Sequence, residues 1–74
     1  MSDRPPLRAL VDAAYERRMN GAELLELIQA HHPTATNIQI IGTMQARQTE
    51  LDREHAAFTR WYLAARLAIT GLRS

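Results

Sequence analysis

A chain of 74 residues with a formal net charge of +1 allows one small domain and excludes a strong overall field for binding nucleic acid. Cysteine is absent, which excludes disulfides and thiolate metal sites as sources of stability. Domains of this size bury a small share of their surface, so we expect the chain to depend on close packing or on a second copy.

The N-terminal residues 1–5 are charged and proline-rich, and we expect them to be flexible. The apolar runs of the sequence are too short for the core of a signal peptide or for a membrane span. The sequence therefore predicts a cytoplasmic protein.

Residues 6–32 are expected to form a helical hairpin. The first helix follows Pro6, ends at Asn20-Gly21 and has an apolar stripe made of Leu7, Leu10, Val11, Ala14, Tyr15 and Met19. Asn20 and Glu23 have the spacing of a capping box, which predicts the start of a second helix that runs to about Ala30. Its buried side is made of Leu24, Leu25, Leu27 and Ile28, and Pro33 closes it.

The segment 34–43 is ambiguous because it is rich in β-branched residues, which favour strands. A strand there would have to pair with a second copy, since no other strand candidate exists in the sequence. We favour a helix and keep the strand as the alternative.

A single long helix is expected within residues 34–72, from roughly residue 37 to residue 71, about 50 Å long. Its basis is an apolar heptad pattern, with positions Ile41, Met44, Gln48, Leu51, His55, Phe58, Tyr62, Ala65, Ile69 and Leu72. The middle of this pattern is polar. Gln48 and His55 either set the register of a dimer seam or mark a solvated stretch between two packed ends, and we favour the solvated stretch.

The expected fold is therefore all-α, with the short N-terminal helical hairpin packed on one long C-terminal helix. The whole chain, residues 1–74, forms one domain. We expect a homodimer, because a helix of this length is too long for the hairpin to cover.

Catalytic chemistry is not indicated. His31, His32 and His55 lack the spacing of metal ligands, and Glu50, Asp52 and Glu54 surround Arg53 on a polar stretch that would not raise a carboxyl pKa. The chain has neither cysteine nor lysine, and no glycine-rich phosphate loop. We predict a protein that is not an enzyme and that uses no metal or cofactor.

The C-terminal third is apolar on all sides, because Leu63, Ala64 and Leu67 lie opposite the heptad stripe. We predict a non-enzymatic protein-binding module: an adaptor, a small chaperone or an inhibitor of a partner protein. Aromatic residues and arginine are enriched among interface hot spots. The predicted partner-binding residues are Phe58, Arg60, Trp61, Tyr62, Leu63 and Arg66. The competing interpretation is that Trp61 and Tyr62 fill the core.

The main alternative is a small dimeric DNA- or RNA-binding regulator, because all nine basic residues are arginine. A helix-turn-helix that uses residues from Thr34 onward for reading fits poorly, since it places Glu26, His32 or Asn37 in the core. Residues 55–73 carry three arginines and no acid, which would also suit a membrane surface. We do not favour the membrane, because the apolar residues are not confined to one face.

Overall fold

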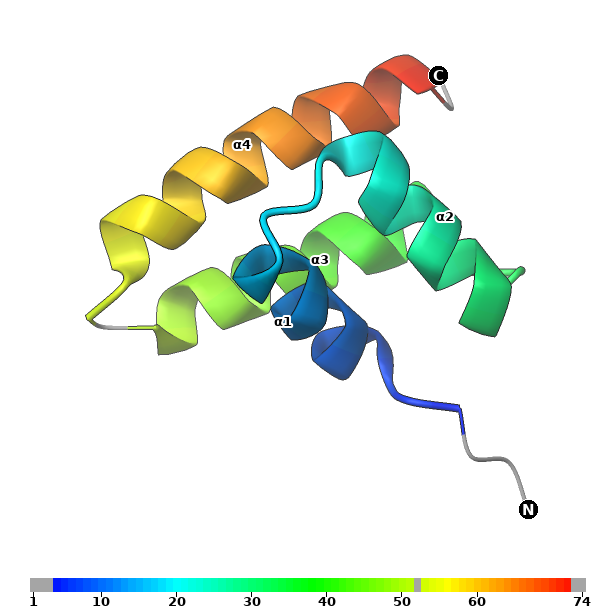
Figure 1. Cartoon of the computed structure of the whole chain (residues 1–74), viewed down its shortest axis with the longest axis horizontal. Coiled ribbons are helices and arrows are strands. Elements are labelled where there is room, and N and C mark those ends of the chain that lie inside the picture. The colour runs from blue at the N-terminus through cyan, green and yellow to red at the C-terminus, as the bar shows by residue number, and fades with distance from the viewer. Residues whose placement is uncertain (1–3, 52, 73–74) are drawn as a thin grey trace.

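The computed structural model describes residues 4–51 and 53–72, and within them the chain forms four α-helices and no strand (Figure 1). Their bounds are α1 Leu7–Glu16, α2 Gly21–His31, α3 Asn37–Glu50 and α4 His55–Leu72. α1 and α4 each pack against both α2 and α3. In Figure 1, α4 runs along the top of the view and α2 descends on the right. The prediction of an all-α fold is confirmed.

The starts of α2 and α3 are both specified by capping boxes. The Asn20 side chain accepts a hydrogen bond from the Glu23 backbone N–H at 2.9 Å, and the Glu23 carboxylate accepts one from the Asn20 N–H at 3.1 Å. Thr36 and Gln39 make the same reciprocal pair at 3.2 Å and 2.9 Å. The first box confirms the predicted start of α2, which ends one residue beyond the predicted Ala30.

One continuous core runs through all four helices, and no described polar or charged residue is fully buried in it. Its largest fully buried side chains are Phe58, Leu24, Ile28, Ile40, Met44, Ile69 and Val11. α2 and α4 lie close together at Gly21, where a Cβ would lie 2.5 Å from the Ala68 Cβ. The first turn of α2 therefore rests directly on α4.

The single long helix is the main incorrect prediction. α3 ends at Glu50 and α4 begins at His55, with Leu51 in a non-helical conformation at φ −94° and ψ 80°. The chain reverses here, so that α4 packs against α3 and α2 of the same molecule. The physical reason is burial: a continuous helix would leave the stripe that contains Phe58 and Ile69 in water unless a second chain covered it.

The polar middle of the heptad pattern also has a different role. Gln48 is part-buried, and its side chain donates to Thr59 Oγ1 at 2.8 Å, which joins α3 to α4 across the reversal. His55 is exposed at the start of α4. Gln48 is thus neither in a dimer seam nor in a solvated stretch in this structure. The strand alternative for residues 34–43 is wrong, because residues 37–43 are helical.

The N-terminal hairpin differs from its prediction in two ways. α1 ends at Glu16, before Asn20, in a turn where Arg18 adopts a left-handed φ of 53°. The Arg18 guanidinium covers the Tyr15 ring at 4.4 Å and donates to the Tyr15 carbonyl at 3.0 Å, which holds this turn. α1 and α2 contact each other, but they pack on two separate helices instead of one long helix. The predicted flexibility of residues 1–3 lies outside the described residues.

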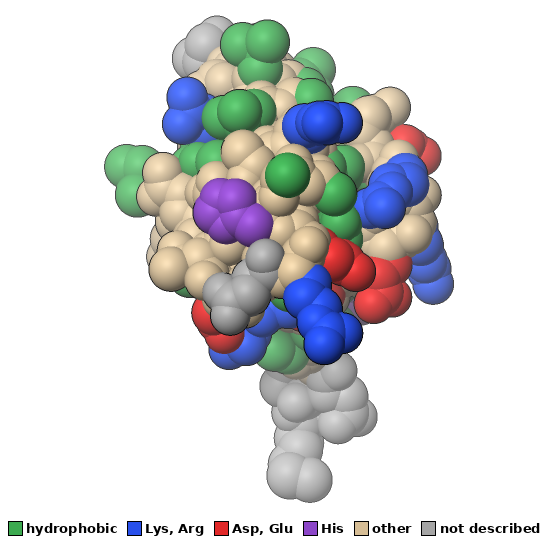
Figure 2. Space-filling model, turned by 90° about the vertical axis from the view of Figure 1, so that its left-hand side faces the viewer, with side chains coloured by type: hydrophobic (Ala, Val, Ile, Leu, Met, Phe, Trp, Pro, Cys, Tyr) green, Lys and Arg blue, Asp and Glu red, His purple; other side chains and the backbone are tan. Residues whose placement is uncertain are grey.

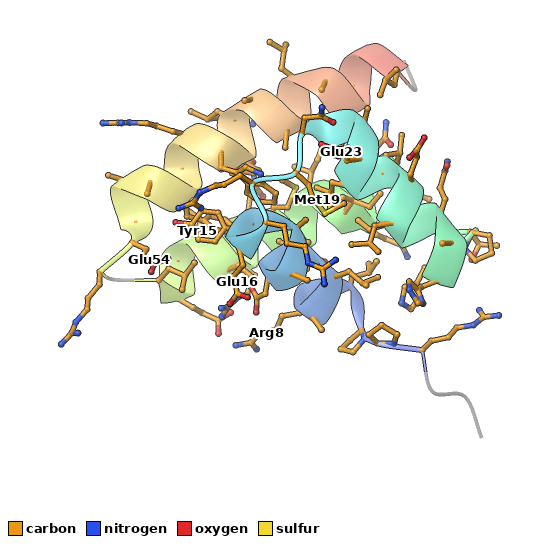
Figure 3. The ribbon with its side chains drawn as sticks, viewed as in Figure 1. Arg8, Tyr15, Glu16, Met19, Glu23 and Glu54 are labelled. Carbon is orange, nitrogen blue, oxygen red and sulfur yellow. The ribbon has the colours of Figure 1, made fainter. Side chains whose placement is uncertain are left out.

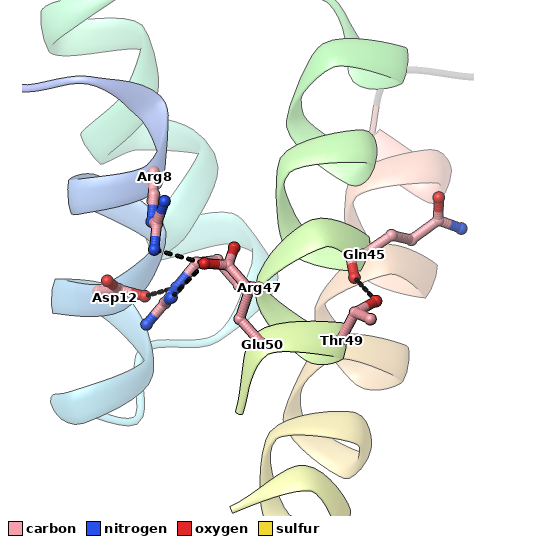
Figure 4. A network of polar contacts seen from close by, with 6 residues as sticks. All are labelled: Arg8, Asp12, Gln45, Arg47, Thr49 and Glu50. Atoms are coloured by element: carbon pink, nitrogen blue, oxygen red, sulfur yellow. Dashed lines mark hydrogen bonds and ion pairs between the residues drawn. The ribbon is translucent and has the colours of Figure 1, made fainter. Parts of the chain in front are cut away.

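A network of four charged residues ties α1 to α3 (Figure 4). Arg47 donates to the Asp12 carboxylate at 2.7 Å, and the Glu50 carboxylate lies 2.5 Å from Arg8 and 3.5 Å from Arg47. The Arg47 side chain is only 15% exposed, so its pairing satisfies a charge that water reaches poorly. Arg8 and Arg47 therefore serve the fold, as Arg18 does in the turn after α1.

Candidate protein-binding surface

Two of the six predicted partner-binding residues belong to the core. Phe58 is fully buried and Tyr62 is 3% exposed. The Phe58 ring lies 5.0 Å from the Tyr15 ring in an edge-on arrangement, and Tyr15 points from α1 toward α4 in Figure 3. Neither aromatic side chain offers a surface to a partner in this structure.

The Trp61 ring packs against the rings of Tyr15 and Phe58. Its ring lies 5.5 Å from Tyr15 and 5.3 Å from Phe58. The indole Nε1 donates to the Met19 carbonyl at 2.7 Å, and Met19 lies in the segment between α1 and α2 (Figure 3). Trp61 is thus part-buried and held in place by the fold. The competing interpretation, in which aromatic residues fill the core, is confirmed for Tyr62.

The remaining predicted residues, Arg60, Leu63 and Arg66, are exposed on α4. Leu63 is 49% exposed, and Leu67, one turn further on, is 76% exposed. Leu63 and Leu67, together with Arg60 and two neighbouring alanines, form one strip along the side of α4 that faces away from the core. We call this strip the α4 outer face, and it consists of Ala56, Arg60, Leu63, Ala64 and Leu67.

The charged side chains of α4 are all positive. No Asp or Glu occurs in its 18 residues, whereas Arg60 and Arg66 are both exposed. Among the described residues Arg60 has no ion-pair or hydrogen-bond partner. Arg66 covers the edge of the core, with its guanidinium 5.8 Å from the centre of the Tyr62 ring. An apolar strip with positive charge beside it is therefore exposed to solvent.

Sequence reasoning missed Leu67 and Ala64 as surface residues of the site. The signal was present, because both lie opposite the heptad stripe. The general enrichment of aromatic residues at interfaces favoured Phe58, Trp61 and Tyr62 instead. Burial decides between the two groups, and burial depends on which side of α4 meets α2 and α3.

In the described part of the chain, no three His, Asp or Glu side chains lie close enough together to hold a metal ion. His32 is engaged in the fold: its Nε2 lies 2.6 Å from the Pro5 carbonyl. A carbonyl oxygen only accepts, so Nε2 carries the proton of this hydrogen bond. No described helix has the length and apolar character that a membrane span requires.

The arginines do not form one basic patch on the face that Figure 2 shows. Basic and acidic side chains lie next to one another on its right-hand and lower parts. Arg8 on α1 and Arg47 on α3 are each paired with a carboxylate. Phosphate binding requires cations that are free to replace counterions, and these two are not.

Comparisons of the chain with protein-family models, with curated proteins and with solved structures found no match.

Proposed function

We propose that this chain is a non-enzymatic protein-binding module, an adaptor, small chaperone or inhibitor, that acts through the α4 outer face. The observation that supports this proposal is the pair Leu63 and Leu67, adjacent and exposed on a helix whose other side is already buried. Exposed leucines one turn apart are the anchors that a helix inserts into an apolar groove of a partner. A groove suits this surface because a helix face is convex.

The charges of α4 indicate the chemistry of the partner. Arg60 lies in the strip and Arg66 beside it, and α4 contains no acid that would neutralise them. A partner groove bordered by carboxylates would pair with these guanidiniums while its apolar floor covers the leucines. A second α4 would be a poor occupant, because it would bring further arginines and no acid.

Affinity capture with surface variants tests the proposal. The Leu63→Gln, Leu67→Gln double variant removes both anchors and adds no charge. Ile38→Gln is the matched control, since Ile38 is 84% exposed but lies on α3. Each variant is expected to keep the wild-type circular dichroism, because exposed substitutions change stability by about 0.5 kcal/mol or less.

The expected result is a partner protein that the wild type and Ile38→Gln retain from an extract and that the double variant loses. Arg60→Glu should weaken retention and Arg60→Lys should preserve it, because the partner's carboxylates select for positive charge. Equal retention by the wild type and the double variant would overturn the assignment.

Nucleic-acid binding is the alternative, and salt separates it from the proposal. Binding to phosphates weakens steeply as salt rises, whereas burial of leucines does not. We expect no binding of the wild type to a random DNA duplex or to single-stranded RNA at low salt. Salt-sensitive binding that is lost in Arg60→Gln, Arg66→Gln would support the alternative.

A further inference from the structure

α3 carries a second unpartnered surface, distinct from that of α4. We call it the α3 outer face, and it consists of Ile38, Gly42, Gln45, Ala46 and Thr49. All five residues are exposed, and none is charged. Ile38 is 84% exposed, more than any other large apolar residue that the structure describes. A solvent-facing side of a helix normally carries charged or polar residues, so the exposed row Ile38, Gly42 and Ala46 indicates contact with another surface.

A groove of about 810 Å³ lies beside this face, between α3 and the start of α1. Leu7 and Ala35 line it together with Ile38, Gly42 and Ala46. Its charged border is already neutralised, because Arg8 pairs with Glu50 and Arg47 pairs with Asp12. The groove therefore repels neither a neutral surface nor another copy of itself.

Gly42 supplies an independent observation. It lies in the interior of α3, where glycine costs about 1 kcal/mol relative to alanine. A Cβ at Gly42 would meet nothing within 4 Å, so packing within the chain does not require a glycine here. Absence of a side chain allows a second backbone to come close. Gly21, by contrast, is required by α4 of the same chain.

We propose that the α3 outer face binds a second copy of this chain, with the two α3 helices antiparallel and crossing at Gly42. In such a pair Ile38 lies opposite Ala46 of the second copy, because each is four residues from the crossing point. A large side chain then packs against a small one on both sides of the two-fold axis. Gln39 comes to the level of Gln45 of the second copy, and its amide NH2 group is free to donate to the Gln45 oxygen, because only its Oε1 is used in the capping box.

Charge favours a second copy over a nucleic acid as the occupant. Two arginines and Glu50 line the groove. Both arginines are already paired with carboxylates, so neither is free to bind phosphate. When this neutral face packs against the same face of a second copy, no like charges meet. A 74-residue chain also has much to gain from association, since its own core is small. The proposal does not depend on the α4 outer face.

Sedimentation equilibrium over a dilution series from millimolar to micromolar chain tests the pairing. The wild type is expected to convert reversibly between dimer and monomer. Gly42→Ala should weaken the dimer at least about tenfold and yet raise the unfolding free energy of the dilute monomer, because alanine favours the helix. Gly71→Ala is the matched control: its Cβ also meets nothing, and it should leave dimerisation unchanged.

Ile38→Gln provides the second variant, and it should weaken the dimer without changing the fold. A wild-type chain that stays monomeric at millimolar concentration would overturn the proposal. So would a dimer that Gly42→Ala and Ile38→Gln leave intact. If a monomeric chain instead binds a DNA duplex and Ile38→Gln abolishes that binding, the α3 outer face is a nucleic-acid surface and the proposal is overturned. The Leu63→Gln, Leu67→Gln variant should still dimerise, which separates this proposal from the one for α4.

Discussion

At the scale of single residues, two helical glycines of this chain differ in the space around them. At Gly21 a Cβ would lie 2.5 Å from the Ala68 Cβ and 2.7 Å from the Ala65 carbonyl oxygen, so the backbones of α2 and α4 touch. At Gly71 a Cβ would meet nothing within 4 Å. The sequence pattern placed Gly21 at the boundary between the first and second helices, and the structure adds that it permits a close helix contact.

Gly21→Ala is therefore expected to lower the free energy of unfolding by about 1–3 kcal/mol, the usual cost of overfilling a packed contact. Part of the added methyl clashes with backbone, which cannot turn away as a flexible side chain would. Urea denaturation followed by circular dichroism measures the change. Gly71→Ala should leave stability equal or slightly higher, and a Gly21→Ala variant as stable as the wild type would show that the contact is looser than described.

At the scale of elements, helix starts are specified more sharply than helix ends. The Thr36 hydroxyl and the Gln39 side chain together satisfy two backbone N–H groups at the start of α3. This box begins a helix inside a segment whose β-branched residues favour strands. Burial of Ile40 and Met44 completes the choice, because only a helix places both on the core side with Gly42 outside.

Thr36→Ala removes the hydroxyl that accepts from the Gln39 N–H, and we expect a loss of about 1 kcal/mol of stability. Thr34→Ala makes the same chemical change at an exposed position in the same connection. Thermal and urea unfolding of both variants, measured beside the wild type, give the comparison. Equal losses for the two threonines would argue against a specific capping role.

At the scale of the whole molecule, the reversal between α3 and α4 turns two halves of one apolar pattern toward a shared core. Met44 and Ile40 come from α3, and Phe58 and Ile69 come from α4. α4 also depends on α2, which it meets at Gly21. None of the four described helices buries its apolar stripe without residues distant in the sequence.

A peptide of residues 34–74 separates this fold from a long self-associating helix. Without α1 and α2 the stripe of α4 loses much of its cover, and isolated helices of this length are marginal in water. We expect the peptide to lose most of the helical circular dichroism signal per residue. A fully helical, dimeric peptide would instead indicate that the heptad pattern is sufficient for a coiled coil.

Most helix positions in this chain are predictable from the sequence, whereas the burial of two of the six predicted binding residues is not. The stripe of α1 and the extent of α2 are local properties, apparent from apolar spacing and from the pair Asn20 and Glu23. The burial of Phe58 and Tyr62 could not be predicted, because every side of α4 carries apolar residues. Periodicity alone cannot rank the sides of such a helix.

The sequence by itself determined the all-helical class, the capped start of α2 and the presence of apolar residues on opposite sides of α4, because each depends on residues within one or two turns. Only the tertiary structure decided where the long helical pattern breaks, which aromatic residues are buried and why residue 21 is glycine. These outcomes depend on contacts between residues far apart in the chain. The free energy of such burial is absent from any local pattern.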